Sequence, residues 1–327
     1  MSSGCSPSKC ETCSHKGQCG QNPEQMKMME EIARRMENIE HKILVLSGKG
    51  GVGKSMVSAQ LAFALARKGY RVGLLDIDIC GPTVPKMLGV RGQGTTKGPN
   101  GLLPVRVNEN LCAMSIGFVV EDDTEPIIWR GPRKLGLIQM FLRDIDWGVL
   151  DFLIVDTPPG TSDEHISIVQ LLKAVAISGA VIVTSPQDVS VVEVGKEIAF
   201  CKKMGVNVLG VVENFSSFAC PLCHGVTEIW PCTHGGGLQL AIDYDVPFLG
   251  RVPLDPQLAR VGERGVELAA TGETATAKAL GDIATQVLDG VLPDRTKPLS
   301  AKLVAEQTAA GSTKKEGEGE GEGDKKQ

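Results

Sequence analysis

The sequence predicts a doubly wound α/β fold with a mostly parallel sheet. Continuous apolar runs alternate with amphipathic segments, and strands that are apolar throughout belong to sheets covered on both faces. A glycine-rich loop joins the first of these runs to the helix predicted after it. The 327 residues, 42% of them hydrophobic, suffice for one large core. We therefore expect one α/β domain over residues 43–290, with extra segments at its two ends.

The predicted strands are Ile43–Ser47, Arg71–Asp76, Phe152–Asp156, Ala180–Ser185 and Asn207–Val212. The predicted helices are Ser55–Lys68, Val189–Met204 with Asp188 as its N-cap, one that starts at Asp255–Pro256, and Thr274–Leu288, which ends at Gly290. Aspartate is a favoured N-cap, and proline at the first helical position loses no needed hydrogen bond. Strands and helices therefore alternate through most of the chain.

Two segments precede this domain. Residues 1–23 form an arm rich in Cys, Gly and Ser with almost no apolar side chains. After the arm, Met26, Met29 and Met36 recur at helical spacing and predict a linker helix over residues 24–42. We expect the methionine stripe to pack against the domain.

The tail, residues 291–327, ends in KKEGEGEGEGDKKQ and has little to bury, so we expect it to be disordered. A net charge of −5 gives no basic field that would attract nucleic acid. The first thirty residues contain no apolar signal region, and the stretch around Ala174–Val183 is too short to cross a bilayer. The sequence predicts a cytoplasmic protein, with nuclear presence compatible, that binds neither nucleic acid nor membranes.

The glycine-rich loop has the sequence of a phosphate-binding P-loop. It consists of Gly48, Lys49, Gly50, Gly51, Val52, Gly53, Lys54 and Ser55. Its glycines let backbone N–H groups face phosphates, and the helix N-terminus that follows favours anions. We expect Lys54 to bind the β- and γ-phosphates of ATP and the Ser55 hydroxyl to ligate Mg²⁺.

Carboxylates follow two of the predicted strands at the edge where an α/β sheet binds its ligands. Asp156 ends the run FLIVD and is predicted to contact magnesium through the ion's water ligands, although a helix N-cap role is an alternative. Asp76 and Asp78 lie in DIDICGP at the end of another strand, and either could orient a water molecule.

The arm contains four cysteines in the pattern C-x4-C-x2-C-x5-C: Cys5, Cys10, Cys13 and Cys19. Clustered cysteines in an unsecreted protein favour metal binding over disulfides. Four thiolates can complete one [4Fe-4S] cluster within a single chain. Zinc is the alternative, because four sulfur ligands suit it equally well.

A second group begins with Cys220 and Cys223, which provide half of the ligands of a cubane cluster. A symmetric dimer would bring two such pairs together, since the same patch meets itself across a two-fold axis. Cys232 and His234 follow in a C-x2-C-x8-C-x-H pattern, so a local zinc site is the competing interpretation. Cys112 and Cys201 stand alone among apolar residues, and we expect them to behave as small hydrophobes.

Several motifs together resemble the Mrp/Nbp family of P-loop ATPases over residues 43 to about 265: GKGGVGKS, DIDICGP, WRGPRK, DFLIVDTPPGTSDEH, VVENFSSFACPLC and GRVPLDP. The early Lys49 resembles the deviant Walker A class, which includes MinD, ParA and the nitrogenase iron protein. This resemblance implies that Lys49 reaches the phosphates of a partner subunit across a nucleotide sandwich. It also implies that Asp78 activates water and that Asn214 contacts adenine.

The resemblance implies a function as well: an ATP-dependent scaffold with weak Mg-ATPase activity that assembles [4Fe-4S] clusters and transfers them to cytosolic and nuclear apoproteins. One cluster would lie in the arm and another would bridge two subunits at the cysteine pair. The partners implied are a second copy or a shorter paralogous ATPase, cluster acceptors and targeting factors. The alternatives are a zinc-stabilised nucleotide-binding adaptor, a redox protein, and a MinD/ParA-type positioning ATPase.

Overall fold

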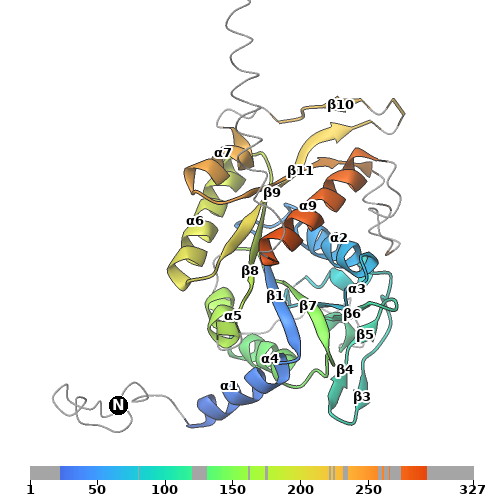
Figure 1. The fold of residues 1–327 in the computed structure, drawn as a ribbon, viewed down its shortest axis with the longest axis vertical. Helices are drawn as coiled ribbons and strands as arrows, with labels where there is room; N and C mark the ends of the chain where they lie inside the picture. The colour runs from blue at the N-terminus through green and yellow to red at the C-terminus, as the bar shows by residue number, and fades with distance from the viewer. Residues whose placement is uncertain are drawn as a thin grey trace, which may run out of the picture.

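The computed structural model describes residues 23–79, 81–119, 131–160, 163–173, 176–220, 222–223, 225–230, 235–256, 260, 265 and 274–292. Most of the predicted arm and tail lies outside these ranges, so the expectations for both stay predictions. Within them, the chain forms a layered α/β structure (Figure 1).

A nine-stranded sheet forms the centre of the structure, in the order β10-β9-β8-β1-β7-β2-β6-β5, with β11 paired to β9. The strands of this sheet are β1 (Ile39–Leu46), β2 (Val72–Asp76), β5 (Val105–Arg106), β6 (Leu111–Met114), β7 (Leu150–Asp156), β8 (Gly179–Thr184), β9 (Val208–Ala219), β10 (Val226–Thr227) and β11 (Phe248–Leu254). All pairings are parallel except β5 with β6 and β10 with β9. A separate hairpin joins β3 (Thr96–Gly98) and β4 (Gly101–Leu103). This topology confirms the predicted fold class.

Helices cover both faces of the sheet (Figure 1). One face carries α2 (Lys54–Arg67), α3 (Val84–Met87) and α9 (Ala275–Val291), and the other carries α1 (Pro23–Met36), α4 (Gly131–Arg143), α5 (Asp163–Lys173), α6 (Asp188–Met204) and α7 (Gly236–Asp243). A short 3-10 turn, Ile116–Phe118, follows β6. Among the described residues, none of these helices is both long and apolar enough to span a membrane.

The core lies around the central strands β1 and β7. β2 and β8 are buried along their whole length, as expected for strands covered on both faces. Phe152 of β7 is fully buried, with the rings of His41 and Tyr70 each centred 5.1 Å from its own. Because β1 lies between β7 and β8, the loop that follows β1 leaves the sheet where the strand order reverses, which is where such sheets bind ligands.

Several predicted boundaries were wrong. The linker helix ends at Met36, and β1 begins at Ile39 because this branched side chain is buried opposite Leu150 in the sheet. Helix α9 continues past the predicted end at Gly290 to Val291, which packs against the core. Asp188 is the first residue of α6 rather than its N-cap, which is Gln187.

Strand β11 was missed by the sequence analysis. It contains Gly250 and Pro253, residues that are normally depleted in strands, yet it pairs along β9 in a register with two irregularities. β9 is also longer than predicted, since it extends through Ala219. Pro256 is helical, in agreement with the helix start predicted there, and most residues after it lie outside the described ranges.

Candidate functional site

The glycine-rich loop turns from β1 into α2 through two left-handed glycines. Gly51 and Gly53 have φ angles of 81° and 80°, a region that residues with a Cβ enter at a cost. Gly53 is the N-cap of α2, and no side chain among the described residues caps this helix. The first N–H groups of α2 are therefore left for a ligand, as at other phosphate-binding helix N-termini.

Gly48 holds the start of the loop against α6. A Cβ at position 48 would lie 2.5 Å from the carbonyl carbon of Glu193 and 2.7 Å from the backbone nitrogen of Val194. No side chain fits in that gap. Lys49 and Gly51, by contrast, are exposed. One end of the loop is therefore fixed on α6, while its middle faces outward.

Two residues of α2 share one oxygen of Asp156. The Nζ of Lys54 and the Oγ of Ser58 each donate a hydrogen bond of 2.7 Å to Asp156 Oδ1. They lie one helical turn apart, so both face the end of β7. The other oxygen, Asp156 Oδ2, is buried and has no partner among the described residues. A buried oxygen without a donor is costly, and it suits a site that binds a cation or its water shell.

Asp76 lies beside Asp156, because β2 and β7 pair these two residues directly. Asp76 Oδ2 accepts from Ser115 Oγ at 3.0 Å, and Asp76 Oδ1 accepts from the backbone N–H of Asp78 at 3.0 Å. Burial and then the nearby Asp156 carboxylate raise the pKa of Asp76 well above its ordinary value of 3.8. Asp76 thus holds the segment that carries Asp78, the predicted water-activating residue, which is half-buried.

Asn214 and Phe215 of β9 contact the same loop. Asn214 Nδ2 donates to the carbonyl of Val52 at 2.8 Å, and its buried Oδ1 has no partner within the described residues. Phe215 has a φ angle of 57°, a strained conformation that costs on the order of 1–3 kcal/mol. Its ring Cζ lies 3.1 Å from where a Cβ on Gly53 would be. The predicted adenine contact, Asn214, therefore lies next to the loop with one acceptor left over.

A cavity of about 150 Å³ lies between the loop, the segment after β8, β9 itself and the segment after β10. Its wall includes Lys49, Gly51, Ser185, Phe215 and Trp230. Trp230 follows the cysteine pair in the sequence, so this cavity brings the glycine-rich loop and the cysteine segment together.

Cys220 and Cys223 lie in the turn between β9 and β10. The backbone N–H of Cys220 donates to the carbonyl of Gly225 at 2.9 Å and closes the turn. The backbone N–H groups of Cys223 and Leu222 hydrogen-bond the Cys220 sulfur and lower the pKa of that thiol. A thiolate is the form in which cysteine ligates metal. Cys223 is exposed and Leu222 is 91% exposed, so the pair lies at the surface of the chain.

Six of the predicted or alternative ligands lie outside the described residues: Cys5, Cys10, Cys13, Cys19, Cys232 and His234. In the part of the chain that the structure describes, no group of three or more His, Cys, Asp and Glu side chains is arranged to hold a metal ion. The arm cluster and the local zinc site therefore both stay predictions.

Cys112 and Cys201 differ from the cysteine pair. Cys201 is fully buried in α6, and Cys112 is half-buried in β6. Burial raises the pKa of both thiols to about 12. Both thiols stay protonated at neutral pH, in line with the expectation that they act as small hydrophobes.

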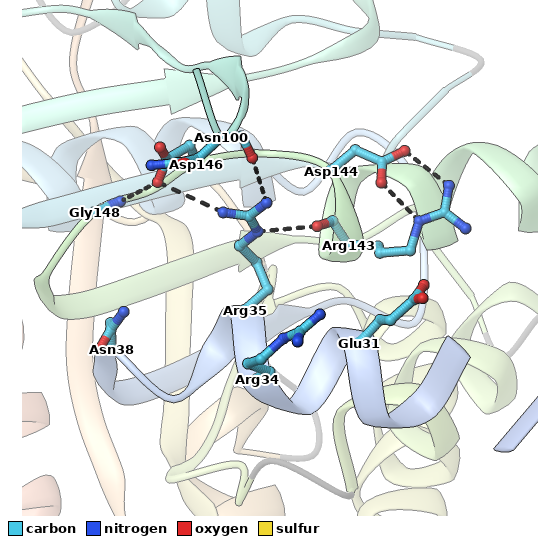
Figure 2. A pocket seen from close by; sticks show the side chains of 9 residues that line it. All are labelled: Glu31, Arg34, Arg35, Asn38, Asn100, Arg143, Asp144, Asp146 and Gly148. Carbon is cyan, nitrogen blue, oxygen red and sulfur yellow. Dashed lines mark hydrogen bonds and ion pairs between the residues drawn. The ribbon is translucent and has the colours of Figure 1, made fainter. Parts of the chain in front are cut away.

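A larger cavity, of about 480 Å³, lies where the end of α1 meets the end of α4. Figure 2 shows that the Arg35 guanidinium reaches across it. Arg35 donates to the carbonyls of Arg143 and Asn100 and lies 3.7 Å from a carboxylate oxygen of Asp146. These contacts fasten α1 to α4 and to the β3–β4 hairpin, near the amino ends of β1 and β7. The glycine-rich loop follows the other end of β1, so this cavity lies away from the loop and its residues hold the fold together.

Three residues of the site were not predicted. Ser58 has a signal in the sequence, because it stands four residues after Lys54 and so shares its face of the helix. Phe215 and Trp230 lie in the glycine-rich loop's cavity only because β9 is long and the chain turns back after it. Short-range patterns do not contain that information.

Known proteins match most of this chain. The ParA family model, described as NUBPL iron-transfer P-loop NTPase, matches residues 38–288. A nucleotide-binding protein from Archaeoglobus fulgidus, solved in complex with ADP, is 34% identical; the match covers 73% of this chain and 92% of that chain with a TM-score of 0.62.

Two cell-division proteins share the fold. MinD from Pyrococcus horikoshii, complexed with Mg-ADP, is 24% identical over 76% of this chain and 96% of that chain, with a TM-score of 0.54. MinD from Pyrococcus furiosus is 22% identical over 76% of this chain and 98% of that chain, with a TM-score of 0.53.

Proposed function

The chain belongs to the ParA/NUBPL family of iron-transfer P-loop NTPases, and from that premise we propose that it is an ATP-dependent scaffold for [4Fe-4S] clusters. In this proposal the chain assembles clusters and passes them to cytosolic and nuclear apoproteins, in the manner of nucleotide-binding protein 35. ATP hydrolysis serves as a switch for assembly or transfer.

The observation that carries the proposal is the pairing of two sites on one strand. β9 contributes Asn214 to the P-loop, and a few residues later it ends at Ala219, directly before Cys220. The Cys220 sulfur already accepts backbone N–H groups, which favour the thiolate that iron requires. The proposed nucleotide site and the cysteine pair, in which Cys223 is exposed and Cys220 is half-buried, thus lie along β9 and the turn that directly follows it.

The residues around Lys54 fit a magnesium nucleotide. Asp156 Oδ2 is a buried acceptor without a partner among the described residues, and Ser55 Oγ lies 3.5 Å from Lys54 Nζ beside it. Ser55 and Asp156 would hold the ion, which would neutralise charge on the phosphates. Lys54 would exchange its bond with Asp156 for the phosphates, and Ser58 would keep Asp156 in place. Asp78 is the proposed residue that orients the attacking water.

The arrangement of the cysteine pair supports a dimer. One chain supplies two thiols at this turn, so a bridging cubane needs a second chain. Leu222 and Val226 are exposed apolar side chains next to the pair, and such patches mark interaction sites. Lys49 of the P-loop is exposed as well, which suits a lysine that reaches a partner's nucleotide. The second chain would be another copy or a shorter paralogue.

The remaining parts of the proposal rest on the resemblance. The arm cysteines would hold a second, stable [4Fe-4S] cluster, and targeting factors and apoproteins would be the partners. The proposed compartment is the cytoplasm, with nuclear presence compatible.

Anaerobic reconstitution with iron and sulfide tests the proposal. Iron, acid-labile sulfide and zinc are measured on the wild type and on Cys220→Ala/Cys223→Ala, with the mass in solution recorded in parallel. Cys112→Ala is the matched control, because it removes a cysteine whose thiol stays protonated. We expect a dimer whose double variant loses about two iron and two sulfide per chain, half of a cubane, while the control loses none.

Other outcomes would favour the alternatives. Zinc without sulfide, unchanged when the dimer dissociates, would favour the zinc-stabilised adaptor. A cluster that is retained through reversible one-electron cycles would favour a redox protein. An equal iron content in the double variant and the wild type would show that the cysteine pair does not ligate a cluster.

A further inference from the structure

β9 and β10 form a hairpin with the cysteine pair at its tip. β10 runs antiparallel to β9, with Val226 opposite Ala219 and Thr227 opposite Phe218. The hydrogen bond from Cys220 to Gly225 closes the tip. In Figure 1, β10 lies at the top of the view, at the edge of the molecule.

The base of the same hairpin lies over the P-loop. The register of β10, continued past Thr227, brings residue 230 level with residue 215. Phe215 and Trp230 indeed line one cavity, whose wall also includes Lys49 and Gly51 of the P-loop. The strained backbone of Phe215 turns its ring toward Gly53. Two aromatic side chains at the hairpin base therefore meet the loop that would hold the phosphates.

This cavity is small for a nucleotide. Its volume is about 150 Å³, whereas ligand sites are usually about 300–1,000 Å³. The P-loop side of the wall is held by Gly48 against α6. Trp230, on the other side, is 37% exposed and belongs to a connecting segment. A nucleotide that enters would therefore move Trp230 rather than the P-loop.

We propose that Phe215 and Trp230 sense the nucleotide and that the β9–β10 hairpin transmits its presence to Cys220 and Cys223. Cys220 follows Phe215 by five residues, about 16 Å of extended chain. Between them Phe218 and Ala219 pair with β10, so that a shift at the hairpin base reaches its tip. Nucleotide binding thereby changes the exposure of the cysteine pair. This inference rests on the proposed function, because it assumes that the P-loop binds nucleotide.

The test uses the reduced full-length chain without metal. The rate at which N-ethylmaleimide modifies Cys223 is followed by peptide mass spectrometry with and without Mg-ADP. Binding of a fluorescent ADP analogue is measured separately. The variants are Trp230→Ala and, as matched control, Ile229→Ala, which removes a neighbouring exposed apolar side chain that does not line the cavity.

We expect Mg-ADP to change the modification rate at least about fivefold in the wild type and in Ile229→Ala, as typical coupling energies imply. In Trp230→Ala the nucleotide should bind with little effect on Cys223. A nucleotide effect that persists in Trp230→Ala would overturn the inference, as would wild-type protein that binds the analogue without any change at Cys223. Failure of the wild type to bind the analogue would instead contradict the proposed function.

Discussion

Replacing Gly53 by alanine tests whether Asn214 and Phe215 rest on the P-loop as the structure shows. Gly53 has a φ angle of 80°, and a Cβ at this position would come within 2.3 Å of Asn214 Nδ2 and 3.1 Å of Phe215 Cζ. Gly51 is a matched control, because its φ angle is 81° and nothing lies within 4 Å of its Cβ position. The two substitutions share the backbone strain and differ in the clash.

The expected magnitudes follow from this difference. Alanine in the left-handed region costs about 1–2 kcal/mol, so Gly51→Ala should lower the free energy of unfolding by that amount. Gly53→Ala also displaces Asn214 from the Val52 carbonyl, which leaves buried polar groups unpaired at a cost of about 1–3 kcal/mol. Its total loss should be about 2–5 kcal/mol.

Urea unfolding of the two variants and the wild type measures this difference. The comparison holds if the free energy of unfolding falls with urea concentration at the same slope in all three proteins. Equal losses for Gly51→Ala and Gly53→Ala, within about 0.5 kcal/mol, would refute the reasoning, since ordinary measurement error is of that size. That result would mean that Asn214 does not press on the loop in solution.

Three further predictions concern single side chains. Ser58→Ala removes one of two hydrogen bonds to Asp156 Oδ1. Because a hydrogen bond contributes about 1 kcal/mol, the magnesium concentration for half-maximal ATPase activity should rise roughly fivefold. An unchanged magnesium dependence would contradict this role. Arg35→Ala should lower the free energy of unfolding by about 2 kcal/mol, because it removes two hydrogen bonds of about 1 kcal/mol each. The exposed Arg34→Ala should change it by less than about 0.5 kcal/mol, and equal losses in denaturant unfolding would refute the role given to Arg35. Burial raises the pKa of Glu197 from 4.5 to about 7, so the folded chain keeps a proton that the unfolded chain releases, and the free energy of unfolding should fall between pH 4.5 and about 7. Glu197→Gln should reduce the fall in the free energy of unfolding by about 1.4 kcal/mol per pH unit in this range. Melting curves of the variant that depend on pH as those of the wild type do would contradict this prediction.

Much of the fold follows from local patterns in the sequence. The runs at Ile43–Leu46, Val72–Asp76 and Phe152–Asp156 are buried on both faces, and continuous apolar residues predict such strands well. The P-loop was predicted from spacing alone, because its glycines and Lys54 act through local backbone geometry.

The parts that were missed depend on contacts between distant residues. β9 extends through Glu213, a carboxylate that looks like a strand end in the sequence. The structure buries it because Arg251 Nε donates to it at 2.9 Å and the backbone N–H of Gly237 donates to its other oxygen. Neither partner is near in the sequence, so no local pattern could show that a charged residue stays inside the sheet.

The site shows the same division. The sequence predicted Lys54 and Asp156 as separate functional residues. In the structure Lys54 Nζ donates directly to Asp156 at 2.7 Å, and Ser58, one turn later in α2, donates to the same oxygen. Trp230 had no signal at all, because its place beside the P-loop depends on the register of a hairpin. The sequence predicts which residue types belong to the site, but not which distant residues come into contact there.

The central claim is that nucleotide at the P-loop controls iron held at Cys220 and Cys223. The most direct measurement is the rate of iron release from the anaerobically reconstituted dimer to a chelator, with and without Mg-ATP, on the wild type and on Lys49→Ala. The account predicts at least about a fivefold change with Mg-ATP in the wild type and little change in the variant. Equal release rates with and without Mg-ATP in the wild type, with nucleotide bound, would contradict it.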